Sequence, residues 1–352
     1  MTGLDQTEVL LAQVEHALAQ QQPLAIVGGN SKHFYGYVAK GQTLSVGQHT
    51  GILHYHPDEL VITARAGTLL SDISQALAEH KQMLAFEPPS FSPAATLGGT
   101  IACGFSGPNR VFAGSARDFV LGCKLINGNA QVVKFGGEVM KNVAGFDVSR
   151  LMVGAMGTLG VLLELSLKVL PLPETTVTHC LTLNVDKALN QMSALCRQSL
   201  PLSGLCYDGQ CLYVRLSGYA SALHAASQKL GGEILPNNIW QQLNEQTLPF
   251  FQTPGQLWRI SLPPATPPLA LPGTWFYDWA GGLRWLKTDC SSDIIFKAAA
   301  DAKGHALLFR AVGEKTSHWQ PLTEPLSALN RGIKHAFDPK GIFNPQRLTP
   351  DW

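Results

Sequence analysis

Apolar residues recur along the first half of the chain in short runs and stripes that predict small helices and strands. Residues 6–20 carry apolar side chains at roughly helical spacing, and Pro23 ends the helix that they predict. A second apolar stripe predicts a helix over residues 69–80. Apolar and β-branched runs predict strands at residues 24–27, 43–46, 60–66 and 161–170, and Asn127-Gly128 predicts a hairpin turn between residues 124–126 and 131–135. The first half is therefore expected to mix helices and strands.

The second half begins near Leu172, after two prolines close the long strand. Its apolar runs predict the order β-α-β-β-α over residues 175–230, which favours a ferredoxin-like sheet with helices on one face. Further strands are predicted at residues 257–262 and 283–287, with a Pro-rich loop between them, and helices at 291–303 and 325–337. A second α+β domain is therefore expected here.

The stretch from Pro88 to Gly107, PPSFSPAATLGGTIACGFSG, has an unusual composition. Its prolines predict that it is not helical, since proline removes a hydrogen-bond donor and fixes φ. Its four glycines permit close approach of another group to the backbone, and its apolar residues exclude a flexible linker. Two interpretations remain open: a tight loop in a β-rich core, or a backbone segment lying against a large ligand.

A strand at residues 24–27 runs directly into Gly28-Gly29-Asn30-Ser31-Lys32. A glycine turn with polar side chains and a lysine is typical of a phosphate cradle, because several backbone N–H groups converge on one anion. The turn has neither the Walker A spacing nor the GxGxxG pattern of a dinucleotide-binding fold. A plain β-turn is the alternative interpretation.

The composition of the chain excludes several classes of protein. The chain has 352 residues, enough for two domains, a formal net charge of +1 and 14 % charged residues. This low charge gives no electrostatic footprint for nucleic acid. Seven scattered cysteines without a CxxC pair predict reduced, buried thiols and neither a metal site nor a disulfide framework. No signal peptide and no apolar window long enough to span a membrane is found, so a cytoplasmic location is expected, with at most a peripheral membrane association through partners.

Several motifs together resemble one flavoprotein family. GGNSK, ATLGGTIACGFSG, GSARDFVLG and GGEVMKNVAGFDVSRLMVGAMGTLGVLLELSLKV are similar to the flavin domain of the vanillyl-alcohol-oxidase/p-cresol-methylhydroxylase (PCMH) type, and IKHAFDPKGIFNPQRL is similar to its closing segment. The similarity covers most of residues 24–171 and 333–348. It is closest to the FAD-binding E subunits of bacterial glycolate oxidase, where LWRISLP and LRWLK also occur.

The resemblance implies an α+β fold with a PCMH-type FAD-binding domain of two subdomains (residues 1–171), a ferredoxin-like cap domain (172–330) and a C-terminal segment that returns to the FAD domain (331–352). It also implies non-covalent FAD, because Asn30 and Ser31 stand where covalent relatives often carry a histidine. The residues that the resemblance places around FAD are Gly28, Gly29, Asn30, Ser31, Lys32, Pro88, Thr96, Leu97, Gly98, Gly99, Cys103, Gly104, Ser106, Gly107, Arg117, Asp118, Val143, Gly145, Phe146, Asp147, Gly154, Gly157, Gly160 and Val161.

Catalytic residues are harder to assign. The larger catalytic relatives carry clustered histidines in the cap, whereas here His305 stands alone, and a structural histidine is the alternative interpretation. Arg259 and Arg284 are candidates to bind a substrate carboxylate. Packing of these arginines on Trp258 and Trp285 explains the same pattern equally well.

The sequence leaves alternative functions open. The first is the FAD-binding subunit of a glycolate oxidase or dehydrogenase complex, which oxidises this 2-hydroxy acid to glyoxylate together with a larger homologous FAD subunit and an iron–sulfur subunit and passes electrons to an acceptor other than oxygen. The second is a self-sufficient FAD-dependent 2-hydroxy-acid or alcohol dehydrogenase. A flavin-free structural subunit has no reason to keep so many glycines, and a nicotinamide dehydrogenase would need the missing GxGxxG pattern.

Overall fold

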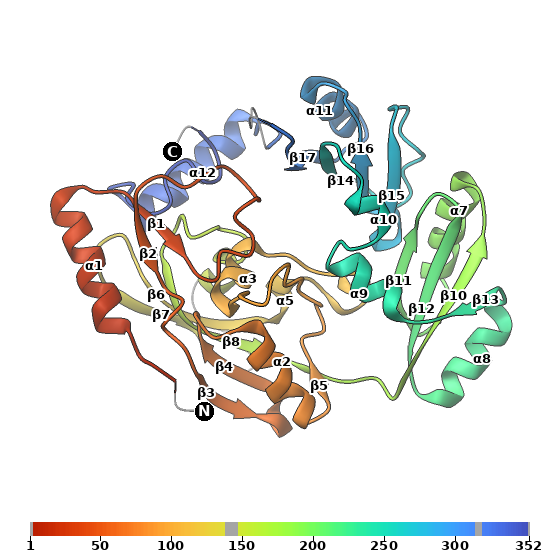
Figure 1. Cartoon of the computed structure of the whole chain (residues 1–352), viewed down its shortest axis with the longest axis horizontal. Coiled ribbons are helices and arrows are strands. Elements are labelled where there is room, and N and C mark those ends of the chain that lie inside the picture. Colours follow the sequence, from red (N-terminus) through yellow and green to blue (C-terminus); the bar gives the residue numbers. More distant parts are fainter. Residues whose placement is uncertain (1–2, 138–146, 314–318, 351–352) are drawn as a thin grey trace. The chain divides into compact units, whose positions relative to one another are not determined.

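The computed structural model describes residues 3–137, 147–313 and 319–350. The chain divides into two units (Figure 1). Unit 1 comprises Met1–Ser106, Ser115–Leu172 and Pro321–Trp352, and unit 2 comprises Gly107–Gly114 and Pro173–Gln320. The eight residues of Gly107–Gly114 thus leave unit 1 and belong to unit 2, an excursion that the hydrophobic pattern does not reveal.

Unit 1 is a mixed helix and sheet structure in which short strands alternate with short helices. Its elements, in chain order, are α1 (Thr7–Gln20), β1 (Leu24–Val27), β2 (Gln42–Ser45), β3 (Ile52–His56), η1 (Pro57–Glu59), β4 (Val61–Arg65), α2 (Leu70–Glu79), β5 (Gln82–Met83), α3 (Leu97–Cys103), α5 (Ala116–Phe119), β6 (Val120–Ile126), β7 (Val132–Gly136), α6 (Val148–Leu151), β8 (Val161–Lys168), β9 (Leu170–Pro171) and α12 (Glu324–Phe337).

The described residues of unit 1 form three sheets. Strands β1 and β2 form a parallel pair, a five-stranded sheet has the order β3-β4-β8-β6-β7, and β5 pairs with β9. One core cluster joins helix α1 to the β1–β2 pair, to β6 and β8, and to the C-terminal segment through Ile342 and Phe343, which are 2 % and 0 % exposed. Burial of these side chains fastens the end of the chain to its beginning.

Unit 2 contains one large sheet with helices. Its elements are α4 (Arg110–Ala113), β10 (Thr175–Thr182), α7 (Val185–Cys196), β11 (Leu202–Tyr207), β12 (Cys211–Gly218), α8 (Ala220–Leu230), β13 (Glu233–Leu235), α9 (Asn238–Asn244), α10 (Pro249–Gln252), β14 (Leu257–Ser261), β15 (Thr274–Asp278), η2 (Trp279–Gly281), β16 (Leu283–Lys287), α11 (Ser292–Asp301) and β17 (His305–Arg310). The sheet has eight strands in the order β13-β10-β12-β11-β15-β16-β14-β17.

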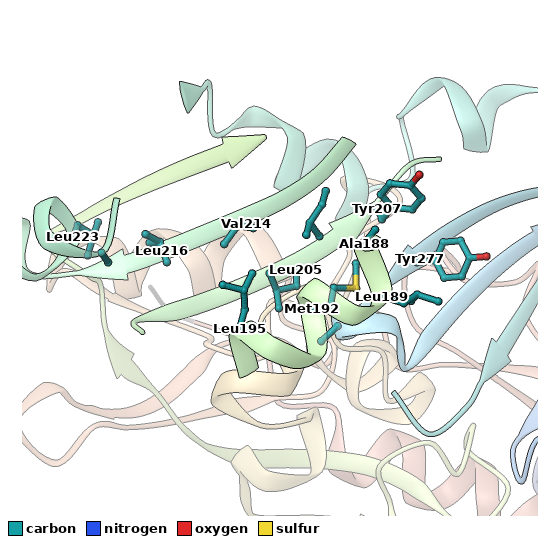
Figure 2. Packing of buried hydrophobic residues seen from close by; sticks show 13 residues of the cluster. Ala188, Leu189, Met192, Leu195, Leu205, Tyr207, Val214, Leu216, Leu223 and Tyr277 are labelled. Atoms are coloured by element: carbon teal, nitrogen blue, oxygen red, sulfur yellow. The ribbon is translucent and has the colours of Figure 1, made fainter. Parts of the chain in front are cut away.

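The first four strands of this sheet, with α7 and α8 between them, follow the chain order β-α-β-β-α-β. Figure 2 shows how α7 covers them: Leu189, Met192 and Leu195 lie over Leu205 and its neighbours on the strands. Strand β15, which the hydrophobic pattern did not indicate, extends the sheet through the pair Tyr207↔Tyr277. Unit 2 is therefore larger than a single four-stranded repeat.

The expectation that the stretch from Pro88 to Gly107 contains no helix is wrong, because α3 occupies Leu97–Cys103. All three prolines precede this helix, so none removes a hydrogen bond from it. The Thr96 side chain caps its first turn by accepting from the Gly99 N–H at 3.3 Å, and Gly104 ends it with φ +66°. The capping threonine outweighs the low helix propensity of Gly98 and Gly99.

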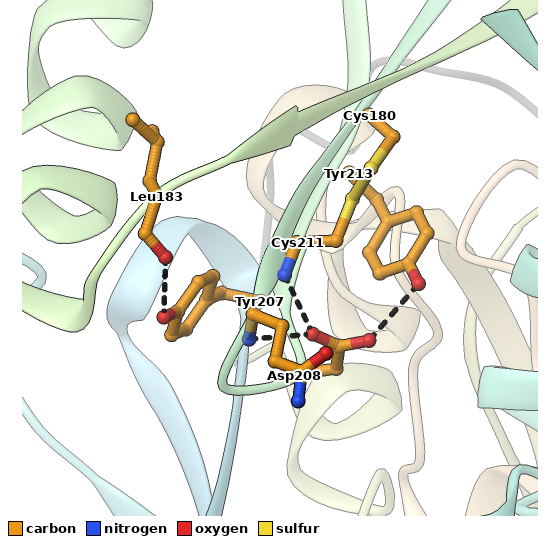
Figure 3. The surroundings of a disulfide bond; sticks show 7 residues. Cys180, Leu183, Tyr207, Asp208, Cys211 and Tyr213 are labelled. Carbon is orange, nitrogen blue, oxygen red and sulfur yellow. Dashed lines mark hydrogen bonds between the residues drawn. A yellow bond between two sulfur atoms is a disulfide. The ribbon is translucent and has the colours of Figure 1, made fainter. Parts of the chain in front are cut away.

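The expectation of seven reduced, buried thiols also needs correction. Cys180 on β10 and Cys211 on β12 are joined by a disulfide (Figure 3). The free Cys196 is exposed. The two strands are antiparallel neighbours, and the Cα atoms of the bonded cysteines lie 5.7 Å apart. Spacing in the sequence does not reveal this pairing, because 31 positions separate the two cysteines.

The disulfide lies beside an ordered turn. Asp208 accepts hydrogen bonds from the backbone N–H of Gln210 and Cys211, at 2.9 and 2.8 Å, and from the Tyr213 hydroxyl at 2.9 Å (Figure 3). This aspartate fixes the hairpin that connects β11 to β12, as Asx turns do.

None of the helices in the described ranges is long and apolar enough to cross a membrane.

Candidate functional site

Strand β1 delivers the chain to the first glycine turn, and it is held on both sides. Its residues Leu24–Val27 pair in parallel with β2, and Leu24 forms a further parallel bridge with Phe343. The Leu24 N–H donates to Ile342 O at 2.7 Å, and the Asn344 N–H donates to Leu24 O at 2.9 Å. The position of the turn is therefore determined by the C-terminal segment as well as by β2.

The turn itself presents a row of backbone donors. No described residue accepts a hydrogen bond from the backbone N–H of Gly28, Gly29, Asn30 or Ser31. Asn30 has φ +54°, the left-handed conformation that brings successive N–H groups to one side in an anion-binding nest. Lys32 follows with 5 % exposure, and its Nζ donates to Ser31 Oγ at 3.2 Å and to Ser90 O at 3.3 Å. The arrangement suits a phosphate group.

The two glycines of this turn are required by the protein itself. A Cβ on Gly28 would lie 2.4 Å from Thr96 Oγ1, and a Cβ on Gly29 would lie 1.4 Å from Ala94 O. The first turn therefore packs directly on the residues that precede α3. Gly28 and Gly29, which suggested a ligand, therefore also allow the first turn to contact the segment before α3.

The N-terminus of α3 is occupied by protein groups. The N–H groups of Leu97 and Gly98 donate to Thr68 O and Ala66 O at 2.8 and 2.7 Å, and the Gly99 N–H is bonded to Thr96. Its donors are thus not available to an anion. One group nearby does lack a partner, because no described residue bonds the buried hydroxyl of Thr100.

A second glycine turn, residues 154–160, packs on the other end of α3. The Gly154 N–H donates to Ile101 O at 3.1 Å, and the Met156 N–H donates to Ala102 O at 2.8 Å. A Cβ on Gly154 would meet no atom of the described residues within 4 Å, so they leave this side of the turn open, whereas a Cβ on Gly157 would lie 2.6 Å from Asn344 Nδ2. Open backbone in this turn leaves room for a flat group.

Cys103, at the end of α3, interacts electrostatically with two cations. Burial raises the pKa of its thiol, and the charges of Lys32 and Arg347 act in the opposite direction. Burial likewise lowers the pKa of Arg347. The first glycine turn, α3 and the C-terminal segment therefore meet at one place, where positive charge is concentrated.

The other predicted cofactor residues have local structural contacts. Asp147 caps α6 through the Arg150 N–H, and Asp118 forms a capping box with Ser115. Ser106 Oγ accepts from the Ala116 N–H at 2.9 Å. The remaining ones are Pro88, which is partly buried, Leu97, which is buried, Arg117, which is exposed, Gly160, which packs on Ile126 O, and Val161, the buried first residue of β8. Val143, Gly145 and Phe146 lie outside the described residues.

The three catalytic candidates lie on two different faces of the sheet in unit 2. Arg259 pairs with Leu307 and Ser261 with His305, so Arg259 and His305 lie on the same face of the sheet, two residues apart along their strands. Arg284 lies on the opposite face, where it is 0 % exposed and donates to Gly281 O at 3.2 Å, to Pro267 O at 2.7 Å and to Thr266 O. Those bonds give Arg284 a structural role in holding the Pro-rich loop.

Arg259 belongs to a cluster that the sequence did not reveal. Its guanidinium carbon lies 5.0 Å from the ring centre of Trp279, and that of Arg110 lies 4.3 Å from the same ring. The Trp279 indole N–H donates to Gly107 O at 3.0 Å, so the Gly107–Gly114 excursion brings Arg110 to this tryptophan. Desolvation and then the charge of Arg259 lower the pKa of His305, which keeps its imidazole neutral at pH 7.

Comparison with known proteins identifies the family. Residues 4–136 match the model of the FAD binding domain. The chain is 48 % identical to the glycolate oxidase subunit GlcE of Escherichia coli (strain K12) over 344 residues, which is 98 % of this chain and 97 % of that protein. The chain belongs to the GlcE family. The expected cofactor, FAD, and the expected class, an FAD-dependent oxidoreductase, are thereby confirmed.

Two further comparisons concern a second glycolate oxidase subunit and a solved structure. Over 143 residues, 40 % of this chain and 30 % of the other, it is 34 % identical to the glycolate oxidase subunit GlcD of Bacillus subtilis (strain 168). An alkyldihydroxyacetonephosphate synthase structure, 14 % identical, superimposes with a TM-score of 0.65 over 96 % of this chain and 75 % of that one. The latter establishes the similarity of fold alone.

The observed residues fit FAD. The row of open N–H groups at residues 28–31 and the buried Lys32 suit its pyrophosphate, and the open side of Gly154 and the unpartnered Thr100 hydroxyl leave space and a donor beside α3. Sequence reasoning missed Asn344, Arg347, Arg110 and Trp279. The only signal for the first two was the C-terminal IFNPQR motif, which carried a family resemblance but no stated role.

Proposed function

We propose that this chain is the FAD-binding subunit of a glycolate oxidase complex that oxidises glycolate to glyoxylate. The observation that carries the proposal is the similarity to GlcE over almost the whole length of both chains, which leaves no large part of either one unmatched. The positively charged turn at residues 28–32 supports it, because a chain that had lost its cofactor would not need an open nest of donors.

We propose partner subunits and an electron acceptor for this chain as well. A larger homologous FAD subunit and an iron–sulfur subunit would complete the complex, and electrons would pass through them to an acceptor other than oxygen. The 34 % identity to GlcD over 143 residues supports the first partner, because it indicates that the two chains are related. FAD is proposed to be bound without a covalent link, because no histidine lies in the Gly28–Lys32 turn.

A second candidate is a chain that oxidises a 2-hydroxy acid by itself, and the arrangement of Arg259 and His305 favours it. Arg259 would bind the carboxylate of the substrate through charge-assisted hydrogen bonds. His305, neutral at pH 7, would accept the proton of the substrate hydroxyl. FAD, when bound, supplies the two-electron acceptor.

The visible spectrum of the chain purified alone, before and after anaerobic addition of glycolate, separates the two candidates. A flavin spectrum that bleaches would assign the oxidation to this chain. A flavin that stays oxidised alone but bleaches after the larger subunit is added would assign it to the complex. A chain that binds no flavin even after reconstitution with FAD would overturn both.

If the flavin bleaches, Arg259→Met should weaken the response to glycolate by roughly ten- to hundredfold in concentration, which is the loss expected for one charge-assisted hydrogen bond to a carboxylate. The measurement is the glycolate concentration that gives half the bleaching, with the flavin content of each variant determined first. Arg197→Met, which removes an exposed arginine beyond the end of α7, is the matched control and should change nothing. An unchanged response of Arg259→Met would exclude this residue as the carboxylate ligand.

A further inference from the structure

The C-terminal segment brings a second cation to the first glycine turn. The Arg347 guanidinium donates to Tyr37 O and to Lys32 O, the latter at 3.5 Å, and the Tyr37 N–H donates back to Arg347 O at 3.1 Å. Arg347 is thereby bonded to both ends of the loop that follows the turn. The bond to Lys32 O brings Arg347 to the residue that supplies the first cation, and both cations act on the pKa of Cys103.

The charge of Arg347 has no partner of opposite sign among the described residues. Its hydrogen bonds go to neutral carbonyl groups, and no carboxylate of the described ranges lies within ion-pair distance of it. The groups that act on its pKa besides burial are Cys103 and Tyr35, and neither is a carboxylate. A partly buried guanidinium without a counterion is costly, so the site favours an anion.

Asn344 holds this segment in place. Its side chain accepts from the Ile26 N–H at 2.7 Å and donates to Met156 O at 2.6 Å, and it is 4 % exposed. One side chain therefore ties β1, which leads to the first glycine turn, to the second glycine turn. The two residues between Asn344 and Arg347 are too few to let the arginine move far from the turn.

We infer that Arg347 is the second cation of the FAD pyrophosphate site and neutralises, together with Lys32, the two negative charges of that group, while Asn344 positions it. The inference rests on the proposed placement of the pyrophosphate at residues 28–32. Two cations and a row of backbone donors match a doubly charged group better than Lys32 alone, and a planar guanidinium bonds phosphate oxygens through two N–H groups at once.

The test measures FAD binding to apoprotein by quenching of flavin fluorescence, for the wild type and for Arg347→Gln, Arg347→Lys and Lys32→Gln. Arg347→Gln should weaken FAD binding by roughly ten- to hundredfold, and Arg347→Lys by less, since the charge is kept. Affinity of the glutamine variant should also depend less on ionic strength, because one attractive charge is gone. Inorganic pyrophosphate should compete with FAD in the wild type and compete less well in Arg347→Gln.

The controls separate this inference from a structural role and from the placement of the pyrophosphate. Arg331→Gln removes an exposed arginine of α12 that pairs with Glu324, and it should leave FAD affinity unchanged. If Arg347→Gln lowers the melting temperature of the apoprotein while competition by pyrophosphate and salt dependence stay as in the wild type, Arg347 is structural and the inference is wrong. If Lys32→Gln also leaves FAD affinity unchanged, the pyrophosphate lies elsewhere and the placement at residues 28–32 fails as well.

Discussion

Replacing Gly29 with alanine should abolish FAD binding and lower the free energy of unfolding by roughly 3 kcal/mol or more, beyond the usual cost of an overpacked position. The added Cβ would lie 1.4 Å from Ala94 O and 2.4 Å from Ala94 C. Both atoms belong to the backbone, so no side-chain rotation can relieve the contact. Either the glycine turn or the segment before α3 must move, and either movement displaces the donors of residues 28–31.

The measurement is flavin content after purification together with chemical denaturation of the apoprotein. Gly332→Ala is the matched control, because Gly332 lies within α12 and a Cβ there would meet no atom within 4 Å in the part of the chain that the structure describes. That change should stabilise the protein slightly, by about 0.5–1 kcal/mol, through better helix propensity. A Gly29→Ala variant with normal flavin content would show that the turn does not pack on Ala94 as described.

Replacing Lys334 with methionine should destabilise the protein by about 3–5 kcal/mol, because it leaves a buried carboxylate without its counterion. The Lys334 Nζ donates to Asp338 Oδ2 at 2.6 Å, to Thr158 O at 2.7 Å and to Phe343 O at 2.9 Å, and the side chains of the ion pair are 7 % and 0 % exposed. This lysine therefore connects α12 to the second glycine turn and to the C-terminal segment.

The Asp338 carboxylate also accepts hydrogen bonds from the backbone, so loss of its counterion affects the residues that it orders. Asp338 also accepts from the N–H groups of Ile342 and Phe343, at 3.1 and 2.8 Å, so its charge orders the residues that pair with β1. Lys297→Met is the matched control: Lys297 and Asp301 have the same spacing on α11, at 2.6 Å, but are 75 % and 65 % exposed. Its expected effect in urea denaturation is below about 1 kcal/mol. Equal effects of the two changes would contradict the burial-based argument.

Local sequence pattern predicted most helices and strands of both units, because each has an apolar face with its own period. The helix predicted over residues 69–80 is α2 (Leu70–Glu79), and the Asn127-Gly128 turn connects β6 and β7 as expected. The pattern failed at α3, where glycines and nearby prolines suggested irregular structure. The helix forms there because Thr96 caps it and because Gly98 packs against Ala66, with its would-be Cβ 2.7 Å from Ala66 Cβ.

The sequence indicates one part of the proposed phosphate site and not the other. Gly28–Lys32 is a contiguous motif, so its residue types suggest a phosphate cradle, with a plain β-turn as the alternative. Arg347 is more than 300 positions away from it and joins the turn only through contacts with the backbone of Tyr37 and Lys32. Every residue type has a backbone carbonyl group, so the residue types of the turn do not show that an arginine bonds there.

The sequence by itself determined the family, the mixed helix and sheet class, the FAD cofactor and the glycine turn that is proposed to hold its phosphates. These depend on residue types and short spacings, which a linear pattern preserves. Only the tertiary structure decided which segments meet: the C-terminal Asn344 and Arg347 at the first turn, the Gly107–Gly114 excursion with Arg110 on Trp279, and the opposite faces of Arg259 and Arg284. The reason is that contacts between distant segments depend on strand order and register, which residue types at single positions do not specify.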